Sequence, residues 1–308
     1  DGFVNKISDY ISKKVADKLT GMCKTDRESY EKYWDDISPF IKFGCLKDEK
    51  FCDKMSDYIL FKNIDHEYLT LKDCIAKNGG AQEAKAEEEK TEAPEGENTE
   101  EKAEEKKVTI YYVTDEQQQS QYINMFKQEG LDEVLLTHNI DSPFVTQLEQ
   151  RNENVQFQRI DADLTDTFKE EVAKEEEEAF KADTETLTDV FRKALENDKL
   201  EVKVEKLKNE NVASMVTLSE QSRRMQEMMK MYNMYGMDPS MFGTDVTLVL
   251  NANHPLVQYV LKNKDGEHVP MFCKQLFDLA MLSNKPLNPE EMTAFINRSN
   301  EIMMLLAK

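Results

Sequence analysis

Apolar positions recur at helical spacing through the first part of the chain. One stripe begins at Phe3, Ile7 and Ile11 and continues through Val15 and Leu19. Apolar residues separated by three or four positions line one face of an α-helix. The pattern therefore predicts that residues 1–78 are mostly helical.

Residues 79–107 break this pattern with a run of Glu, Lys and Ala. The run contains no aromatic residue and no aliphatic side chain larger than Ala, so it cannot bury enough apolar surface to offset its ordering entropy. We expect a disordered acidic tether. One long Ala/Glu/Lys helix is the alternative, although Gly79, Gly80, Pro94 and Gly96 would interrupt it.

Strand-like and helix-like segments alternate over residues 108–170. The segments VTIYYVT, EVLLT and VQFQRID are rich in β-branched and aromatic residues, whereas EQQQSQYINMFKQEG and SPFVTQLEQR between them have helical character. Alternation of this kind is typical of a parallel sheet with right-handed crossovers. A small α/β sandwich is predicted here.

Residues 171–308 have a different order of segments. The pattern predicts an acidic helix (FKEEVAKEEEEAF) that spans the boundary, a second helix (ETLTDVFRKALEN), three strands (EVKVEKL, VASMVTL and DVTLVLN), a Met-rich helix and three closing helices. We expect this part to be an α+β domain that ends in a helix pair. The expected fold class is therefore α/β followed by α+β.

The charge of the chain restricts its partners. Asp and Glu total 61 against 40 Lys and Arg, which gives a net charge of -21. This charge repels phosphate backbones and anionic lipids, so we expect neither nucleic acid nor membrane as a partner. The sequence also has no apolar run long enough to span a bilayer and no signal-peptide pattern at its start.

Cysteine and histidine usage does not suggest a metal site or a catalytic centre. The five cysteines form an odd set without CxxC spacing and match no zinc-ligand pattern, so we expect them to be small core side chains in a reducing cytoplasm. The histidines have no Ser or Cys partner at a recognisable catalytic spacing. The turn DEQQQ after the first predicted strand lacks glycine and carries two carboxylates, which argues against a nucleotide site.

The Met-rich segment SEQSRRMQEMMKMYNMY is the strongest local signal. Met225, Met228, Met229 and Tyr232 fall on one face of the predicted helix. Flexible, polarisable methionines suit a surface that accepts partners of different shapes. A core face is the alternative, since most amphipathic helices pack within their own domain.

The last two predicted helices, VPMFCKQLFDLAMLS and NPEEMTAFINRSNEIMMLLAK, carry more apolar surface than a closing hairpin usually buries. Two such hairpins related by a twofold axis would form a four-helix dimer interface. Packing inside the chain's own domain is the alternative. The candidate interface residues are Phe272, Leu276, Leu279, Phe295, Ile296, Met303 and Leu306.

The order of these segments resembles the ninety-kilodalton heat-shock protein family, of the bacterial high-temperature protein G type. The stretches that carry the resemblance are YEKYWDDISPFIKFGCLKDEKF, TIYYVTD, EVLLTHNIDSPFVTQLE and LVLNANHPLVQYVL with the closing helices. Together they correspond to the late middle domain and the C-terminal domain. The combination in order is specific, although no single stretch is.

The resemblance implies a dimeric chaperone of the stress response whose full-length form binds ATP and magnesium in an N-terminal domain. The chain starts with Asp1 rather than Met, so we expect it to begin inside a longer protein and to hold neither cofactor nor catalytic residue itself. It ends in LLAK, without the acidic tail that recruits helical-repeat co-chaperones. A cytoplasmic dimeric scaffold without chaperone activity is the alternative function, and an enzyme is the third.

The resemblance also assigns client-binding residues. The Met-rich helix is similar to the family's amphipathic client-binding helix, which favours Met225, Met228, Met229 and Tyr232 as contacts to unfolded or partly folded proteins. Phe144 follows the motif that can carry tryptophan in bacterial members, and it is the fifth candidate. The expected parts are a helical part of the middle domain (1–78), a tether (79–107), a sandwich (108–170) and a client-binding and dimerisation domain (171–308).

Overall fold

The computed structural model describes residues 2–79, 107–162, 168–219, 223–224 and 246–307. The expected tether and the Met-rich helix lie outside the described residues. Contacts within the chain divide it into two compact units, which we call unit 1 and unit 2. Among the described residues, unit 1 takes 2–114 and 130–160, and unit 2 takes 115–129 and 161–307.

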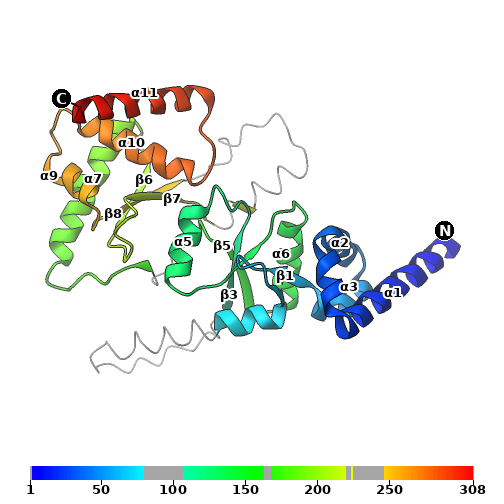
Figure 1. The fold of residues 1–308 in the computed structure, drawn as a ribbon. Coiled ribbons are helices and arrows are strands. Elements are labelled where there is room, and N and C mark those ends of the chain that lie inside the picture. The colour runs from blue at the N-terminus through cyan, green and yellow to red at the C-terminus, as the bar shows by residue number, and fades with distance from the viewer. Residues whose placement is uncertain (1, 80–106, 163–167, 220–222, 225–245, 308) are drawn as a thin grey trace. The chain divides into compact units, whose positions relative to one another are not determined.

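Unit 1 begins with three consecutive helices, α1 (Gly2–Thr25), α2 (Arg27–Lys47) and α3 (Glu49–Met55) (Figure 1). Two aspartates separate them. The Asp26 side chain accepts a hydrogen bond from the backbone of Ser29 and starts α2, while the Asp48 side chain accepts from the first backbone amides of α3. The two aspartate side chains accept hydrogen bonds from backbone amides that have no partner within the helix. Three helices can therefore follow each other with a single residue between them.

A short β-hairpin, which the sequence pattern did not show, interrupts residues 1–78; these residues are otherwise mostly helical, as expected. Strand β1 (Leu60–Lys62) pairs antiparallel with β2 (Tyr68–Thr70). Asn63 closes the turn, because its Oδ1 accepts from the amides of Asp65 and Glu67 at 3.1 and 2.8 Å. Strands of three residues are too short to show an alternating pattern in the sequence.

The rest of unit 1 confirms the predicted parallel sheet. Strands β3 (Val108–Val113), β4 (Glu133–Leu135) and β5 (Val155–Arg159) lie in the order β4-β3-β5, and β3 is parallel to both neighbours. Helix α6 (Asp141–Arg151) connects β4 to β5. Helix α5 (Ser120–Gln128) connects β3 to β4, but its contacts assign it to unit 2.

Aromatic side chains tie the hairpin to the rest of unit 1. The Trp34 indole donates a hydrogen bond to the Leu60 carbonyl at 2.9 Å, and the Phe61 ring lies 5.9 Å from the Phe157 ring between centroids. The indole and the two phenyl rings are at most 2% exposed. Helix α2, the hairpin and the parallel sheet therefore share one core.

Unit 2 is built around a mixed sheet. Strands β6 (Glu201–Glu205), β7 (Ser214–Thr217) and β8 (Thr247–Asn251) lie in the order β6-β8-β7. Strand β8 is parallel to β6, antiparallel to β7 and buried along its whole length. A central strand of this kind needs apolar side chains on both faces, which explains its continuous run TLVLN.

Besides α5, the described residues of unit 2 form four helices: α7 (Glu177–Leu195), α9 (Pro255–Lys262), α10 (Val269–Leu282) and α11 (Pro289–Leu306). Helix α10 packs against α7 and β7, and α11 lies beside α10 (Figure 1). The three expected strands and three closing helices are therefore confirmed.

The expected acidic helix is wrong in its first half. Residues 168–176 are not helical, and α7 begins only at Glu177. Backbone hydrogen bonds from Glu170 to Lys206 at 2.7 Å and from Lys208 to Phe168 at 3.1 Å pair the start of this segment with residues 206–208 instead, and residues 174–176 form a turn. Pairing with another segment gives these backbone groups hydrogen-bond partners. It does so without placing the like-charged glutamates one helical turn apart, as a helix would.

Candidate functional site

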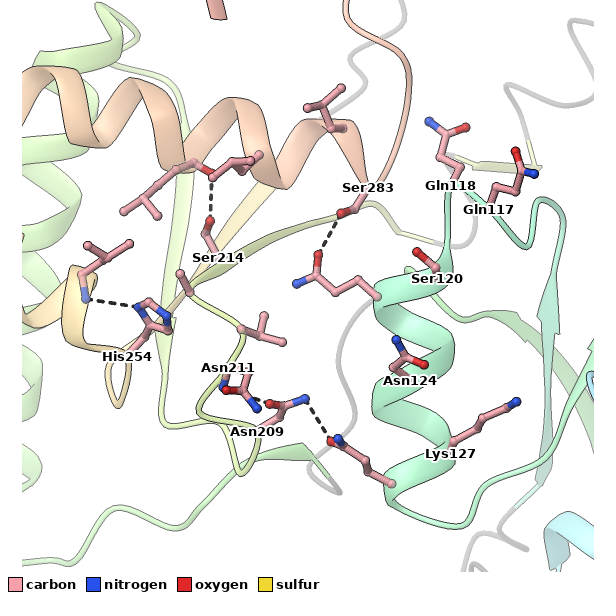
Figure 2. A pocket seen from close by; sticks show the side chains of 18 residues that line it. Gln117, Gln118, Ser120, Asn124, Lys127, Asn209, Asn211, Ser214, His254 and Ser283 are labelled. Carbon is pink, nitrogen blue, oxygen red and sulfur yellow. Dashed lines mark hydrogen bonds between the residues drawn. The ribbon is translucent and has the colours of Figure 1, made fainter. Parts of the chain in front are cut away.

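A hollow with a volume of about 1060 Å³ lies in unit 2. We call it the groove. Its walls are the polar face of α5, the loop over residues 209–214 with His254, and the side of α10 (Figure 2). It is open to solvent along one side, as a binding surface for a chain molecule would need to be.

Helix α5 is held in the groove wall by its own amphipathic pattern. Tyr122, Ile123, Met125 and Phe126 are buried, which leaves the opposite face with its amides at the groove. The buried Tyr122 hydroxyl also donates to the Val216 carbonyl in β7 at 2.7 Å. This single buried hydrogen bond fixes the helix against the sheet of unit 2.

Two side-chain hydrogen bonds cross the groove at its ends. The Ser283 hydroxyl donates to Gln121 Oε1 at 2.8 Å, and Asn209 Nδ2 donates to Gln128 Oε1 at 2.9 Å (Figure 2). Both contacts join α5 to segments far away in the sequence. They set the width of the groove, so it is formed by the fold and is present without a ligand.

The groove lining is free of acidic residues, although the chain has 61 Asp and Glu among 308 residues. Of the eighteen described residues that line it, only Lys127 and His254 can carry a charge. The polar remainder consists of amides and hydroxyls: Gln117, Gln118, Ser120, Gln121, Asn124, Gln128, Asn209, Asn211, Ser214 and Ser283. Neutral donors and acceptors of this type match the peptide groups of another chain.

His254 has a structural role in the groove wall. Its Nδ1 accepts from the Leu256 amide at 3.1 Å and caps α9. Burial lowers the pKa of His254, which favours the neutral ring that this acceptor role needs. Lys127 therefore supplies the charge of the groove at neutral pH.

The apolar part of the groove lies on α9 and α10. Leu256 and Leu279 are 39% and 45% exposed, whereas Leu276 is only 2% exposed. The Ser214 hydroxyl is already engaged, since it donates to the Leu276 carbonyl at 2.8 Å.

The predicted interface residues of the last two helices divide into two groups. Leu276 is 2% exposed and packs in the core of unit 2, so its expected place on an open surface is corrected. Phe272 and Phe295 are partly buried against the same core. The remaining four are exposed by 45–84%: Leu279, Ile296, Met303 and Leu306.

Helix α11 has no buried residue over its eighteen positions. Besides the partly buried Met292 and Phe295, which pack against the core of unit 2, polar contacts hold it to α10. Both terminal nitrogens of Arg298 donate to Asp278 at 2.8 Å, and Gln275 donates to the Ser299 hydroxyl at 3.0 Å. The sequence interpretation also missed Met304 and Leu305, which are 60% and 38% exposed near the end of this helix.

The predicted client-binding residues are not brought together by the described structure. Met225, Met228, Met229 and Tyr232 lie outside the described residues. Phe144 is 0% exposed in the core of unit 1, and the ammonium of Lys42 lies 5.8 Å from the centre of its ring. A partner cannot reach this ring in the folded unit, so Phe144 is corrected from a client contact to a core residue.

Two further searches concern metal ions and membranes. It contains no group of three or more His, Cys, Asp or Glu side chains arranged to hold a metal ion. None of its helices has the length and apolar character needed to cross a membrane.

Comparison with known proteins identifies the family. The family model described as Hsp90 protein matches residues 85–308. The chain is 32% identical over 275 residues to the chaperone protein htpG of Bacteroides fragilis (strain YCH46), which covers 87% of this chain and 37% of the relative. It is also 32% identical over 294 residues to the chaperone protein HtpG of Porphyromonas gingivalis (strain ATCC 33277), covering 92% and 39%.

The chaperone protein HtpG of Bacteroides thetaiotaomicron is 30% identical over 272 residues, covering 86% of this chain and 37% of that protein. The chain thus spans less than two fifths of the length of these relatives. The segments of unit 2 that form the groove and the exposed helix pair lie within the matched range. This chain belongs to the Hsp90 family of chaperones.

Proposed function

We propose that this chain binds unfolded or partly folded client proteins and forms a homodimer, and that it catalyses no reaction by itself. The exposed apolar surface of α11 is the observation that carries the proposal. In this proposal ATP and magnesium belong to the full-length protein. The net charge of -21 opposes binding to nucleic acid and to anionic membranes.

Dimerisation follows from the lack of burial along α11. A helix gains most of its stability in a protein by packing an apolar face. Ile296 and Met303 are 50% and 58% exposed, so this face has no cover within the described part of the chain. A second copy of the α10–α11 pair would cover it and form a twofold four-helix bundle.

Client binding draws on two surfaces. The groove offers neutral amides for peptide groups and the exposed Leu256 and Leu279 for apolar side chains. The methionines at 225, 228 and 229 add a flexible apolar stripe to the proposed client surface. The described residues that line the groove include no acidic side chain, so the groove does not repel an unfolded chain by negative charge.

Sedimentation at micromolar concentration tests the dimer. We expect the wild-type chain to be a dimer and a truncation before Asn288, which removes α11, to be a monomer. Ile296→Asp should also be a monomer, because a buried unpaired charge costs several kcal/mol and twofold symmetry repeats this cost in the partner. Ala294→Asp is the matched control: Ala294 is exposed on the side of α11 that carries Glu290 and Glu301, and this variant should remain dimeric. A monomeric wild type would refute the proposal.

Suppression of aggregation of an unfolded test protein separates a chaperone from a dimeric scaffold. The proposal expects suppression by the wild-type chain and a clear loss when Met225, Met228 and Met229 are all replaced by Ser. A chain that dimerises without any suppression would be a scaffold. If the triple variant loses its cooperative unfolding, these methionines belong to a core.

A further inference from the structure

A second hollow lies in unit 2, between α7, β6 and α9, and has a volume of about 450 Å³. We call it the side pocket, and it shares no lining residue with the groove. Its size falls within the range of small-molecule sites, roughly 300–1,000 Å³. Eleven described residues line it: Glu176, Ala179, Phe180, Asp183, Leu187, Val204, Lys206, Ala252, Asn253, Gln258 and Leu261.

Helix α7 contributes one of its faces to the side pocket. Phe180, Asp183 and Leu187 follow each other at steps of three and four residues, which places their side chains on the same side of the helix. Leu187 and Val204 are 2% and 6% exposed in the core of unit 2, and Phe180 packs against that core. The side pocket therefore offers apolar surface to the body of a ligand.

The charged part of the lining contains a carboxylate without a counter-charge. Lys206 Nζ lies 2.7 Å from Glu176 Oε2 and 6.0 Å from the centre of the Phe180 ring, so Lys206 and Glu176 neutralise each other. Asp183 is partly buried and makes no hydrogen bond or ion pair with another described residue. The lining therefore keeps one negative charge in excess, at Asp183.

The two amides of the side pocket present acceptors. Asn253 Nδ2 donates to Glu170 Oε2 at 2.9 Å and to the Leu207 carbonyl at 3.2 Å. Gln258 Nε2 donates to the Ala252 carbonyl at 2.7 Å. Since these nitrogens are engaged within the protein, the side-chain oxygens of Asn253 and Gln258 remain for a ligand. A carboxylate and two amide oxygens together favour a ligand with N–H donors.

We propose that the side pocket binds a small organic cation, namely a primary ammonium or guanidinium group on an apolar body. The charged group pairs with Asp183 and donates to the amide oxygens, while the apolar body packs against Phe180 and Leu187. Partial burial strengthens such a pair, because less water screens the two charges than at a fully exposed site. This binding is independent of client binding and of dimerisation.

The same cationic chemistry occurs in free amines and in the lysine and arginine side chains of polypeptides, and two probes distinguish these sources. The first is 2-phenylethylammonium, and the second is a Gly-Arg-Gly peptide blocked at both ends. Isothermal titration calorimetry of the full, folded chain measures the Kd of each. We expect binding of at least one probe. The anion 3-phenylpropionate, which has a similar apolar body, should bind at least about tenfold more weakly than that probe.

Asp183→Asn tests the site within the chain. Loss of the unpaired carboxylate should weaken binding of the cation at least about tenfold. Because the net charge of -21 attracts any cation, Asp189→Asn is the matched control: Asp189 is exposed on α7 and does not line the side pocket, and its substitution removes the same charge. This control should bind the probes as the wild-type chain does.

The outcomes separate the two sources and can refute the site. Binding of the amine alone assigns a free amine as the ligand, whereas tighter binding of the peptide assigns a basic side chain of a polypeptide. The comparison of cation and anion on the wild-type chain stands even if a variant fails to fold. Three results would overturn the proposal: no binding of either probe, equal binding of 3-phenylpropionate, or equal weakening by Asp183→Asn and Asp189→Asn.

Discussion

At the scale of single residues, the ion pair between Lys42 and Asp141 is the most consequential contact of unit 1. Their side chains are 6% and 4% exposed, and Asp141 also accepts from the His138 amide at 2.9 Å. Asp141→Asn would leave the Lys42 ammonium buried without an opposite charge. We expect this change to lower the free energy of unfolding by about 3–5 kcal/mol, measured by urea unfolding.

The exposed pair of Lys62 and Asp35 is the control for that prediction. The Lys62 ammonium nitrogen lies 2.8 Å from Asp35 Oδ2, but the Asp35 side chain is 53% exposed. Water solvates either charge when the other is removed, so Asp35→Asn should cost less than about 1 kcal/mol. Equal losses at the two sites would show that burial does not set the strength of the Lys42 pair.

Asp73 provides a test of pH dependence. Hydrogen bonds from the Thr70 backbone amide, at 2.8 Å, and from the Thr70 hydroxyl lower the pKa of Asp73. A lowered folded-state pKa gives stability that is present above the ordinary aspartate pKa and lost as the pH falls through the lowered value. Asp73→Ala should therefore cost about 1 kcal/mol at about pH 7 and almost nothing at about pH 2.

Urea unfolding at both pH values measures this difference. Asp36→Ala is the matched control, since Asp36 is exposed within α2 and lies away from a helix start. Asp36→Ala should not lower the free energy of unfolding at either pH, because alanine favours a helix interior. A cost of Asp73→Ala that persists in acid would mean that the carboxylate charge is not responsible.

At the scale of elements, the sequence predicted most helices and strands because their apolar patterns extend over several turns or pairs. It failed where the decisive contacts are distant. The sequence pattern predicts a helix over residues 168–176, yet the backbone of residues 168–170 pairs with residues 206–208. The hairpin of β1 and β2 depends on one side chain, Asn63, whose turn-forming hydrogen bonds leave no periodic signal.

The start of α11 was predicted correctly, because its signal is local. Asn288 accepts from the Glu291 amide at 2.8 Å, and the Glu291 carboxylate accepts from the Asn288 amide at 2.9 Å. Since α11 has no buried residue, this capping box should contribute much of its local stability. Asn288→Ala should cost about 1 kcal/mol and speed hydrogen exchange in the first turns.

Asn300→Ala is the comparison for this effect, because Asn300 lies within α11 where alanine is the better helix former. Hydrogen exchange of the helix should slow slightly or stay the same in that variant. Equal acceleration in both variants would show that loss of any asparagine, rather than loss of the cap, loosens α11.

At the scale of the whole molecule, the family and the apolar closing helices could be predicted from the sequence, but the groove could not. The groove wall combines Gln121, Asn209, His254 and Ser283, which come from four separate segments, and no local motif links them. Its lack of acidic residues becomes visible only after folding brings these segments together. Sequence patterns likewise could not separate the buried Leu276 from the exposed Leu279, because both lie on one amphipathic helix.

The two units each bury a core of their own, which leads to the last prediction. Trp34 is the one tryptophan of the sequence and lies in the core of unit 1, so its fluorescence reports the unfolding of that unit. Phe191 is 0% exposed in the core of unit 2. Phe191→Ala should lower the free energy of unfolding of unit 2 by about 3–5 kcal/mol and lower the temperature of one calorimetric transition. The midpoint of the fluorescence transition should not change.

Phe157→Ala is the reciprocal variant, because Phe157 is 2% exposed in the core of unit 1. It should lower the fluorescence midpoint by removing packing from the unit that contains Trp34. Because separate cores can lose their packing in separate steps, the pair of variants should shift different transitions in scanning calorimetry. If both variants shift the fluorescence midpoint and every calorimetric transition equally, the chain unfolds as one cooperative body instead.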